Sequence, residues 1–198
     1  MPTPGGGSYT AADRARLAID PPGHRPPPMD LPDIRLFSAD NPELVEAARL
    51  LFREYAQSIA IDLCFQGFDG ELAGLPGDYA RPYGALLLAS VDGELAGCGA
   101  LRALRDVDYP NACEMKRLYV RPAFRRFGIG RQIAQALIDE GVAAGYSVML
   151  LDTLDDMEAA RGLYGSLGFE EVPPYYYNPI PGAHYLKCDL AAPLPTVY

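Results

Sequence analysis

The chain has few of the residues that build metal centres and disulfide frameworks. Its 198 residues include no tryptophan, two histidines and four cysteines. The cysteines form no CxxC pair and are widely scattered, at Cys64, Cys98, Cys113 and Cys188. Zinc sites and small disulfide-bonded domains instead show closely spaced cysteines and histidines. We therefore expect neither a metal site nor a disulfide framework.

Basic residues are also in the minority, with 17 lysines and arginines against 26 aspartates and glutamates and a formal net charge of -9. Proteins that bind nucleic acids neutralise phosphates with many basic side chains. The composition therefore predicts no nucleic-acid partner, whereas an acidic surface tolerates cationic small molecules.

Long hydrophobic runs are missing as well. No apolar run in the sequence approaches the roughly 20 residues that a membrane-spanning helix needs, and the first residues lack the charged and apolar regions of a signal peptide. Both absences predict a protein of the cytoplasm without a membrane partner. The 49% hydrophobic and 22% charged residues are those of one globular domain, as a monomer or a homodimer.

Proline and glycine, by contrast, are abundant at the N-terminus, where residues 1–32 hold a GGG run and a PPP run. Such a segment cannot bury enough apolar surface to form core elements. The composition predicts a flexible tail over residues 1–32, a domain over residues 33–191 and a second tail over residues 192–198. A short helix over residues 11–19, packed on the domain or on a second subunit, is the alternative for part of the first tail.

Hydrophobic spacing within the domain predicts alternating strands and helices. Asp92-Gly93, between two apolar runs, is a strong hairpin signal. The strands are expected over residues 34–37, 83–91, 94–101, 112–120, 147–152, 169–172 and 183–190.

Three helices are expected between these strands. Asn41 caps the first, just before a proline at the first helical turn. Gly145 ends the second. Asp155 caps the third, which ends at Gly168.

The stretch over residues 113–144 combines a strand, a turn rich in arginine and glycine, and an amphipathic helix. The first amide groups of a helix have no internal partner and attract anions. Gly128 and Gly130 remove side chains at this point, so a ligand can approach the backbone closely. The turn also carries three arginines that suit forked contacts with a pyrophosphate, namely Arg125, Arg126 and Arg131.

An ordinary strand-to-helix turn with solvated arginines would show a similar pattern. Two other nucleotide-binding loops do not fit, because Ile133 replaces the third glycine of GxGxxG and no GxxxxGK[ST] occurs. The sequence Arg125-x-x-Gly128-x-Gly130, however, resembles the [QR]xxGx[GA] coenzyme A signature of the GNAT family of N-acetyltransferases.

A second motif, Leu163-Tyr164-x-x-x-Gly168-Phe169, resembles the other signature of that family. The resemblance implies an α/β (α+β) fold with a central mixed, mostly antiparallel sheet flanked by helices. It also implies acetyl-CoA as co-substrate, no metal, and direct transfer of the acetyl group to the primary amine of a small-molecule acceptor.

The resemblance further implies where acetyl-CoA binds. In the family the central strand splays from its neighbour, and backbone amides there bind the pantetheine and polarise the acetyl carbonyl. Met157 departs from the pattern, because many members have asparagine at this position. The residues so implicated are Leu118, Tyr119, Val120, Arg125, Arg126, Phe127, Gly128, Ile129, Gly130 and Arg131.

Chemistry requires a base, because an alkylammonium has no lone pair with which to attack a thioester. Glu114 is the only carboxylate in the predicted central strand, and alternation places it on the face of Lys116, Leu118 and Val120. Several family members carry their base at this position. A glutamate that only pairs with Lys116, with water as the base, is the alternative.

Tyr164 corresponds to a family tyrosine that lies near the coenzyme sulfur and protonates the leaving thiolate. A tyrosine on the apolar stripe of a helix can also be simply a core residue.

The acceptor is expected between the segment over residues 64–79 and the loop that contains three consecutive tyrosines. Aromatic rings give apolar walls and a negative π-face that suits a cationic amine. A short helix with core-filling phenylalanines is the alternative for the first segment, and an exposed sticky patch for the loop. The candidate acceptor residues are Phe65, Phe68, Tyr79, Tyr175 and Tyr176.

Three other functions stay open at this point. The chain could bind coenzyme A as a sensor without catalysis, acetylate an amine of a protein, or use its tyrosine loop to bind another protein.

Overall fold

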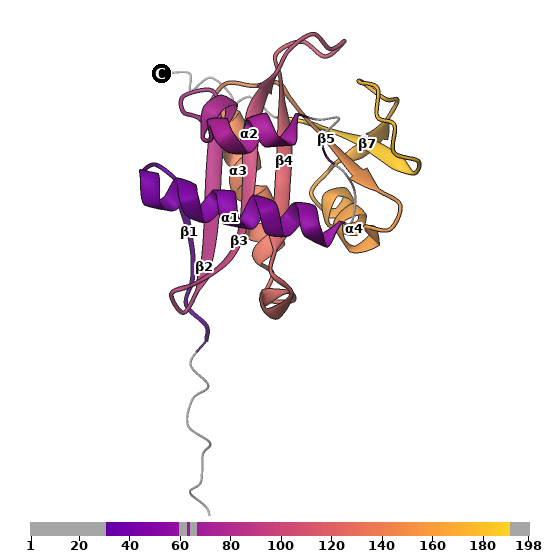
Figure 1. Cartoon of the computed structure of the whole chain (residues 1–198). Coiled ribbons are helices and arrows are strands. Elements are labelled where there is room, and N and C mark those ends of the chain that lie inside the picture. Colours follow the sequence, from indigo (N-terminus) through magenta and orange to yellow (C-terminus); the bar gives the residue numbers. More distant parts are fainter. Residues whose placement is uncertain (1–30, 60–62, 64–66, 191–198) are drawn as a thin grey trace, which may run out of the picture. The chain divides into compact units, whose positions relative to one another are not determined.

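A computed structural model describes residues 31–59, 63 and 67–190 (Figure 1). Most of the predicted N-terminal tail, the short helix over residues 11–19, the C-terminal tail and Phe65 lie outside this part of the chain. No helix within it is both long enough and apolar enough to cross a membrane.

The described residues form a seven-stranded sheet in the order β1-β2-β3-β4-β5-β7-β6. Strands β4 and β5 run parallel, and every other neighbouring pair is antiparallel. The predicted mixed, mostly antiparallel sheet is therefore confirmed. The strands are β1 (Ile34–Ser38), β2 (Ala85–Val91), β3 (Glu94–Leu104), β4 (Ala112–Val120), β5 (Val148–Leu154), β6 (Glu170–Val172) and β7 (Ala183–Asp189).

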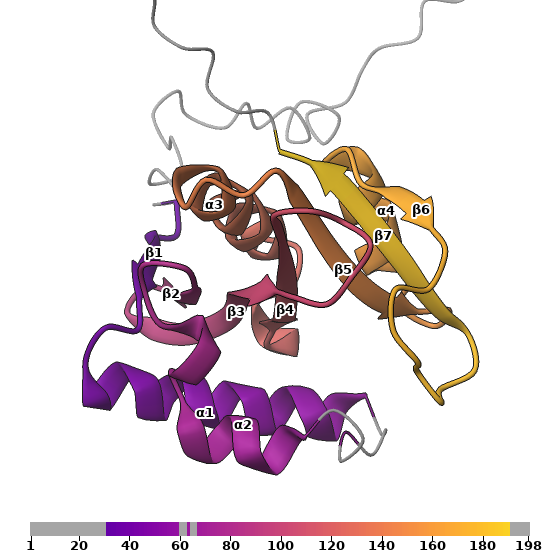
Figure 2. The ribbon, with the colours of Figure 1, turned by 90° about the horizontal axis from the view of Figure 1, so that it is seen from above.

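Helices cover both faces of this sheet (Figure 2). One face carries α1 (Pro42–Ser58), α2 (Phe68–Gly74) and the 3-10 helix η3 (Gly77–Tyr79). The other carries α3 (Ile129–Ala143) and α4 (Glu158–Ser166), and a second 3-10 helix, η4 (Pro122–Phe124), precedes α3. Each face buries its own hydrophobic cluster, as a sheet covered on both sides requires.

Most of the local signals in the sequence act as predicted. The side chain of Asn41 accepts a hydrogen bond from the Leu44 amide at 2.9 Å and so caps α1. Asp92 and Gly93 have φ values of 51° and 84°, which form the two-residue hairpin turn between β2 and β3. Gly145, with φ of 83°, follows the end of α3.

The predicted cap of α4 is wrong. The helix begins at Glu158, so the capping position falls on Met157, which makes no side-chain cap. Asp155 lies two residues too early and instead approaches His184 Nε2 with its Oδ1 at 2.6 Å. The Asp155 side chain, which the local pattern assigned to the helix as a cap, thus forms a long-range ion pair with His184 of β7.

A β-bulge interrupts the central strand β4. Opposite β3, Cys98 pairs with Tyr119 but Ala100 pairs with Lys116, so two residues of β4 face the single Gly99. One of the two, Arg117, has φ of 58°, in the left-handed region.

The bulge overturns the predicted alternation along β4. Lys116 and Arg117 both contact side chains on the α1–α2 face, whereas Leu118 and Val120 pack in the cluster beneath α3. The prediction that Leu118 and Val120 share a face with Glu114 is therefore wrong, because one extra residue reverses the side of every residue after it.

Strands β4 and β5 separate soon after they meet. Their pairing covers only Ala112 with Val148, Cys113 with Met149, and Glu114 with Leu150, although β4 continues to Val120 and β5 to Leu154. An opening therefore lies between the two central strands, bordered by α1 on one face and α4 on the other.

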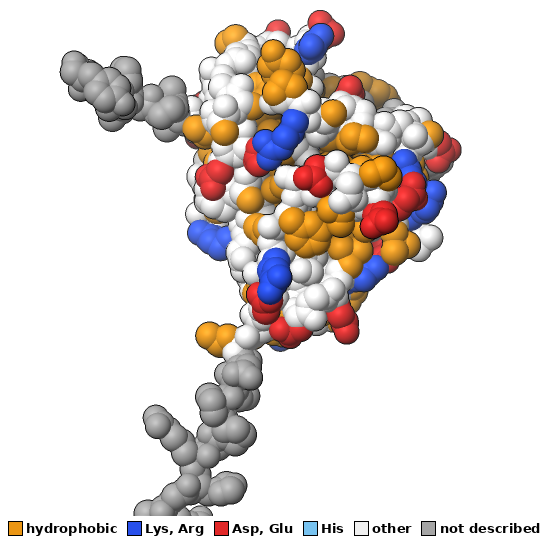
Figure 3. Space-filling view, turned by 90° about the vertical axis from the view of Figure 1, so that its left-hand side faces the viewer, with side chains coloured by type: hydrophobic (Ala, Val, Ile, Leu, Met, Phe, Trp, Pro, Cys, Tyr) orange, Lys and Arg blue, Asp and Glu red, His pale blue; other side chains and the backbone are white. Residues whose placement is uncertain are grey.

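One face of the molecule is shown in Figure 3. Basic and acidic side chains are interspersed on it instead of gathering by charge. This face offers no extended basic patch of the kind that binds nucleic acids.

The close packing of β3 against β4 predicts a steric test. A Cβ atom at Gly97 would lie 2.6 Å from the Tyr119 carbonyl oxygen, so we expect Gly97→Ala to lower the free energy of unfolding by about 1–3 kcal/mol in urea denaturation. The matched control is Gly162→Ala in α4, where nothing lies within 4 Å of the new atom. It should be neutral or stabilising by up to ~1 kcal/mol, and equal losses in both variants would contradict the packing argument.

Candidate active site

A cavity of about 90 Å³ occupies the opening between β4 and β5, and we call it the cleft cavity. Residues 115–118 of β4 and 152–154 of β5 form its two long walls. Tyr55 of α1 and Met157, Ala160 and Tyr164 near or on α4 also line it, together with Ile59, Leu63, Asn178 and Ile180. The separation of the two strands thus creates a site in the middle of the sheet.

The predicted glycine turn lies where α3 begins. Gly128 is the residue before the helix and has φ of 73°, a conformation that side chains disfavour. The first hydrogen bond of the helix runs from the Gln132 amide to the Gly128 carbonyl at 3.1 Å, so the amides over residues 129–131 are not used by the helix. A Cβ atom at Gly130 would point toward Val120 and Leu163, at 3.7 and 3.8 Å.

The arginines and Phe127 surround this turn as exposed side chains. Arg125 donates to the Val120 carbonyl at 3.1 Å, and Arg131 donates to Ser166 Oγ at 2.6 Å. Amide groups and guanidinium groups are therefore gathered at one exposed helix start, as a phosphate site requires.

The three predicted residues at the end of β4 face different ways. Leu118 lines the cleft cavity, and Val120 is half-buried next to Gly130. Tyr119 is buried toward α1, with its ring centroid 6.2 Å from that of Tyr55, which leaves its backbone as the part that can meet a ligand.

Tyr164 is buried in the wall of the cleft cavity, with its ring centroid 5.7 Å from that of Phe169. Burial, and after it the nearby Tyr55 and Asp152, raises the pKa of the Tyr164 hydroxyl. The group is therefore protonated at neutral pH and has a proton to donate. Met157, where the family pattern has asparagine, also lines the cavity.

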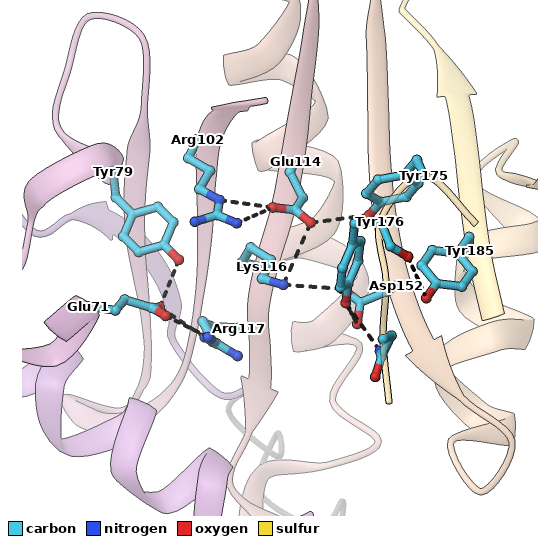
Figure 4. A network of polar contacts seen from close by, with 11 residues as sticks. Glu71, Tyr79, Arg102, Glu114, Lys116, Arg117, Asp152, Tyr175, Tyr176 and Tyr185 are labelled. Atoms are coloured by element: carbon cyan, nitrogen blue, oxygen red, sulfur yellow. Dashed lines mark hydrogen bonds and ion pairs between the residues drawn. The ribbon is translucent and has the colours of Figure 1, made fainter. Parts of the chain in front are cut away.

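Glu114 lies at the point where β4 and β5 separate and is only 1% exposed. Its Oε2 contacts Arg102 Nε at 2.9 Å and Nη2 at 2.7 Å. Its Oε1 accepts from the Tyr175 hydroxyl at 3.2 Å and lies 3.6 Å from Lys116 Nζ (Figure 4). A carboxylate has about four acceptor positions, so these neighbours occupy the group on all sides.

Lys116 and Asp152 bridge the opening. Lys116 Nζ lies 3.2 Å from Asp152 Oδ1, and Asp152 Oδ2 accepts from the Tyr176 hydroxyl at 2.9 Å (Figure 4). Sequence reasoning missed Asp152, although it is the only charged residue in β5. A lone carboxylate within an apolar buried strand was the available signal.

Arg117 and Glu71 tie α2 to the bulge of β4. The Arg117 guanidinium contacts both oxygens of Glu71, at 2.9 and 2.5 Å, and lies 5.1 Å from the centroid of the Phe68 ring. Tyr79 donates to Glu71 at 2.8 Å. Burial opposes ionisation of Glu71, but Arg117 and then Tyr79 outweigh it, so the pKa of Glu71 is below its ordinary value of 4.5.

A second cavity of about 270 Å³ lies on the α1–α2 face of the sheet, and we call it the polar cavity. Its lining includes Glu71, Arg102, Glu114 and residues 104–107 and 175–177. Lys116 and Arg117 line both this cavity and the cleft cavity. The two cavities therefore share one wall.

The predicted acceptor residues divide between cavity and core. Tyr175 and Tyr176 line the polar cavity, and Tyr177 is 86% exposed. Phe68 and Tyr79 are buried in the hydrophobic cluster beneath α1 and α2, as the alternative interpretation of this segment had it. Phe65 lies outside the described residues.

Both signature motifs lie within a region that matches a family of known proteins. The sequence model described as "Acetyltransferase (GNAT) family" matches residues 44–169. The chain belongs to the GNAT family of acetyltransferases. An uncharacterized N-acetyltransferase of Schizosaccharomyces pombe is 38% identical over 160 residues, which cover 80% of this chain and 96% of that protein.

Two further matches extend the comparison of this acetyltransferase. The human N-acetylaspartate synthetase is 30% identical over 141 residues, which cover 70% of this chain and 46% of that protein. The structure of yncA from Salmonella typhimurium, with its cofactor acetyl-CoA, superposes with a TM-score of 0.60 at 20% identity over 81% of this chain and 96% of that one. The last likeness shows the shared fold.

The chain is therefore an acyltransferase of the GNAT type, with acetyl-CoA as its co-substrate. Its structure fits that co-substrate, because an exposed helix start with unused amides and a cavity between separated strands lie next to each other. Among the described residues, no group of three or more His, Cys, Asp or Glu side chains is placed to hold a metal ion.

The ion pair between Arg117 and Glu71 predicts a stability effect. Glu71→Gln removes the negative charge that pairs with the buried Arg117 guanidinium, and such a loss typically lowers the free energy of unfolding by about 3–5 kcal/mol. The pKa of Glu71 is lowered in the folded protein, so its contribution is present above the unfolded pKa and is lost as the pH falls below about 4.5. Urea denaturation between pH 3 and 7 measures both effects.

The double variant Glu71→Gln, Arg117→Met is the control, because it removes both charges and should recover most of the loss. A single variant as stable as the parent would contradict a structural role for this pair.

The start of α3 predicts a binding effect. Acetyl-CoA should raise the melting temperature, since a ligand selective for the native state stabilises it. Gly130→Glu should abolish the rise, because a carboxylate at the helix start opposes an anionic ligand. Gly70→Glu on α2, with the same change of charge and nothing within 4 Å of the new Cβ, should keep the full rise. An unchanged rise in the Gly130 variant would place the pyrophosphate elsewhere.

Proposed function

We propose that this acetyltransferase transfers the acetyl group from acetyl-CoA to the primary amine of a small-molecule acceptor. The observation that carries the proposal is the shared wall of Lys116 and Arg117 between the cleft cavity and the polar cavity. An amine in the polar cavity would meet a thioester in the cleft cavity at the border that these two residues form. Direct attack then needs no covalent intermediate on the protein.

The size of the polar cavity favours a small acceptor. Its volume of about 270 Å³ suits a metabolite, and hydrogen bonds to Glu114 and Asp152 hold Tyr175 and Tyr176 in its lining. The name of one relative, N-acetylaspartate synthetase, describes a small N-acetylated product, which agrees with the same acceptor class.

Acetyl-CoA is held by the residues predicted from the family resemblance. The amides and arginines over residues 125–131 bind the pyrophosphate, and the backbone over residues 118–120 meets the pantetheine and polarises the acetyl carbonyl. Only the backbone is required at the second place, which fits the different directions of the three side chains there.

The reaction requires two proton transfers. The amine attacks in its neutral form. As its nitrogen bonds to the acetyl carbon and the carbon–sulfur bond breaks, the nitrogen gives one proton to Glu114 and the leaving thiolate takes one from Tyr164, and the proton on Glu114 returns to Tyr164 through solvent. Glu114 must exchange one of its contacts for the amine, and its hydrogen bond to Tyr175, at 3.2 Å, is the longest of its hydrogen bonds.

A screen for free thiol tests the proposed function. Acetyl-CoA is incubated with a panel of amino acids, polyamines, aromatic amines and aminoglycosides, and separately with lysine-containing peptides. Release of coenzyme A with at least one small amine, together with the N-acetylated product by mass spectrometry, supports the proposal. Acetylation of peptides alone would overturn it.

The two carboxylates at the shared wall predict different pH profiles. Glu114→Gln should lower kcat by ~10²–10⁴-fold and remove the acid limb of the rate profile, as loss of a general base requires. Asp152→Asn is the matched control, because it also removes a partner of Lys116 but should keep the acid limb. Loss of the limb in the Asp152 variant alone would assign the base to Asp152 instead. Melting temperatures of both variants check that each folds.

A further inference from the structure

The polar cavity reverses the charge balance of the protein. The chain has 26 acidic and 17 basic residues, yet the cavity lining has four basic side chains against three acidic ones, Glu71, Asp106 and Glu114. The basic ones are Arg102, Arg105, Lys116 and Arg117. An excess of cations in a pocket of an acidic protein points to a ligand with a negative group.

Three of these cations already have carboxylate partners. Arg117 is paired with Glu71, and Lys116 lies between Glu114 and Asp152. Arg102 contacts Glu114 with two of its three nitrogen atoms and stays 31% exposed. A guanidinium has five N–H donors, so Arg102 keeps donors for a further acceptor.

Arg105 is the fourth cation of the lining and is followed in the chain by Asp106, which also lines the cavity. Arg105 follows β3, is exposed and lines the polar cavity. Among the described residues it takes part in no recorded ion pair, in contrast to Arg102, Lys116 and Arg117. Arg102 and Arg105 therefore offer guanidinium donors to a ligand in the polar cavity.

The same cavity also suits an amine. Glu71 and Glu114 provide negative charge in its lining, with Glu114 directly beside Arg102, and Tyr175 and Tyr176 provide ring faces and hydroxyl oxygens. A small molecule with a cationic amine close to an anionic group would match both kinds of side chain. Neither a simple amine nor a polyamine would use the two arginines.

We propose that the acceptor is an amino acid, with its carboxylate bound by Arg105 and Arg102 and its amine directed at the wall formed by Lys116 and Arg117. The inference rests on the proposed function and specifies its acceptor class. The two arginines select acceptors that carry a carboxylate, because a forked guanidinium matches the two oxygens of a carboxylate. The amine is held for attack because the carboxylate is held first.

Matched acceptors test the inference. Values of kcat/KM are measured for amino acids with acidic, neutral and basic side chains, each beside its α-carboxamide and its decarboxylated amine. We expect the amino acids to be preferred by about 10- to 100-fold, the effect of a hydrogen bond to a charged group. Arg105→Gln should remove most of this preference by raising the KM for the amino acid, with the KM for acetyl-CoA unchanged.

The control variant is Arg53→Gln, an exposed arginine of α1 outside the lining of both cavities, which should keep the full preference. Equal kcat/KM for amino acids and their analogues without a carboxylate would overturn the inference and leave the proposed function standing. The same holds if Arg105→Gln and Arg53→Gln behave alike. Acetylation of none of the small amines would overturn both.

Discussion

The buried ion pair between Arg117 and Glu71 is the contact on which both cavities depend. A guanidinium that is removed from water is stable only when its charge is matched closely, and Glu71 matches it with both oxygens. Because Arg117 comes from the bulge of β4 and Glu71 from α2, this one pair fixes the helix against the central strand. The wall of the cleft cavity and the wall of the polar cavity are then placed by the same contact.

Side-chain ion pairs take over where backbone pairing between β4 and β5 ends. The last backbone pair joins Glu114 and Leu150, and two residues further along each strand Lys116 and Asp152 form an ion pair. Where the two strands separate, side-chain ion pairs therefore replace backbone hydrogen bonds between them. Hydrogen bonds from the hydroxyls of Tyr175 and Tyr176 to Glu114 and Asp152 connect these ion pairs to the loop between β6 and β7.

Local signals explain how much of the fold was predictable. Asn41, Asp92-Gly93 and Gly145 act within a few residues of themselves, so their structural effect can be recognised without knowing the rest of the fold. The glycine turn and Tyr164 were found because each belongs to a short motif with fixed spacing. The mixed sheet came from the resemblance that these motifs carry.

The site lay beyond such signals wherever it depends on distant contacts. Arg117 adopts φ of 58° although it is neither glycine nor asparagine. The local sequence therefore gives no signal for the bulge that turns Leu118 and Val120 to the other face. Asp155 has the residue type of a cap, but His184 holds it from 29 residues away. The partners of Glu114 likewise come from β3 and from a loop 61 residues away.

The short pairing between β4 and β5, which we call the seam, also divides the sheet into two weakly connected halves. Strands β1 to β4 and strands β5 to β7 are joined by the backbone over only three residue pairs, so the remaining polar backbone along the seam is left to solvent or to a bound molecule. A ligand that lies along the cleft contacts both halves and acts as a cross-link between them. The resistance of this region to local unfolding, and hence to proteolysis, therefore rises and falls with the amount of co-substrate around the protein.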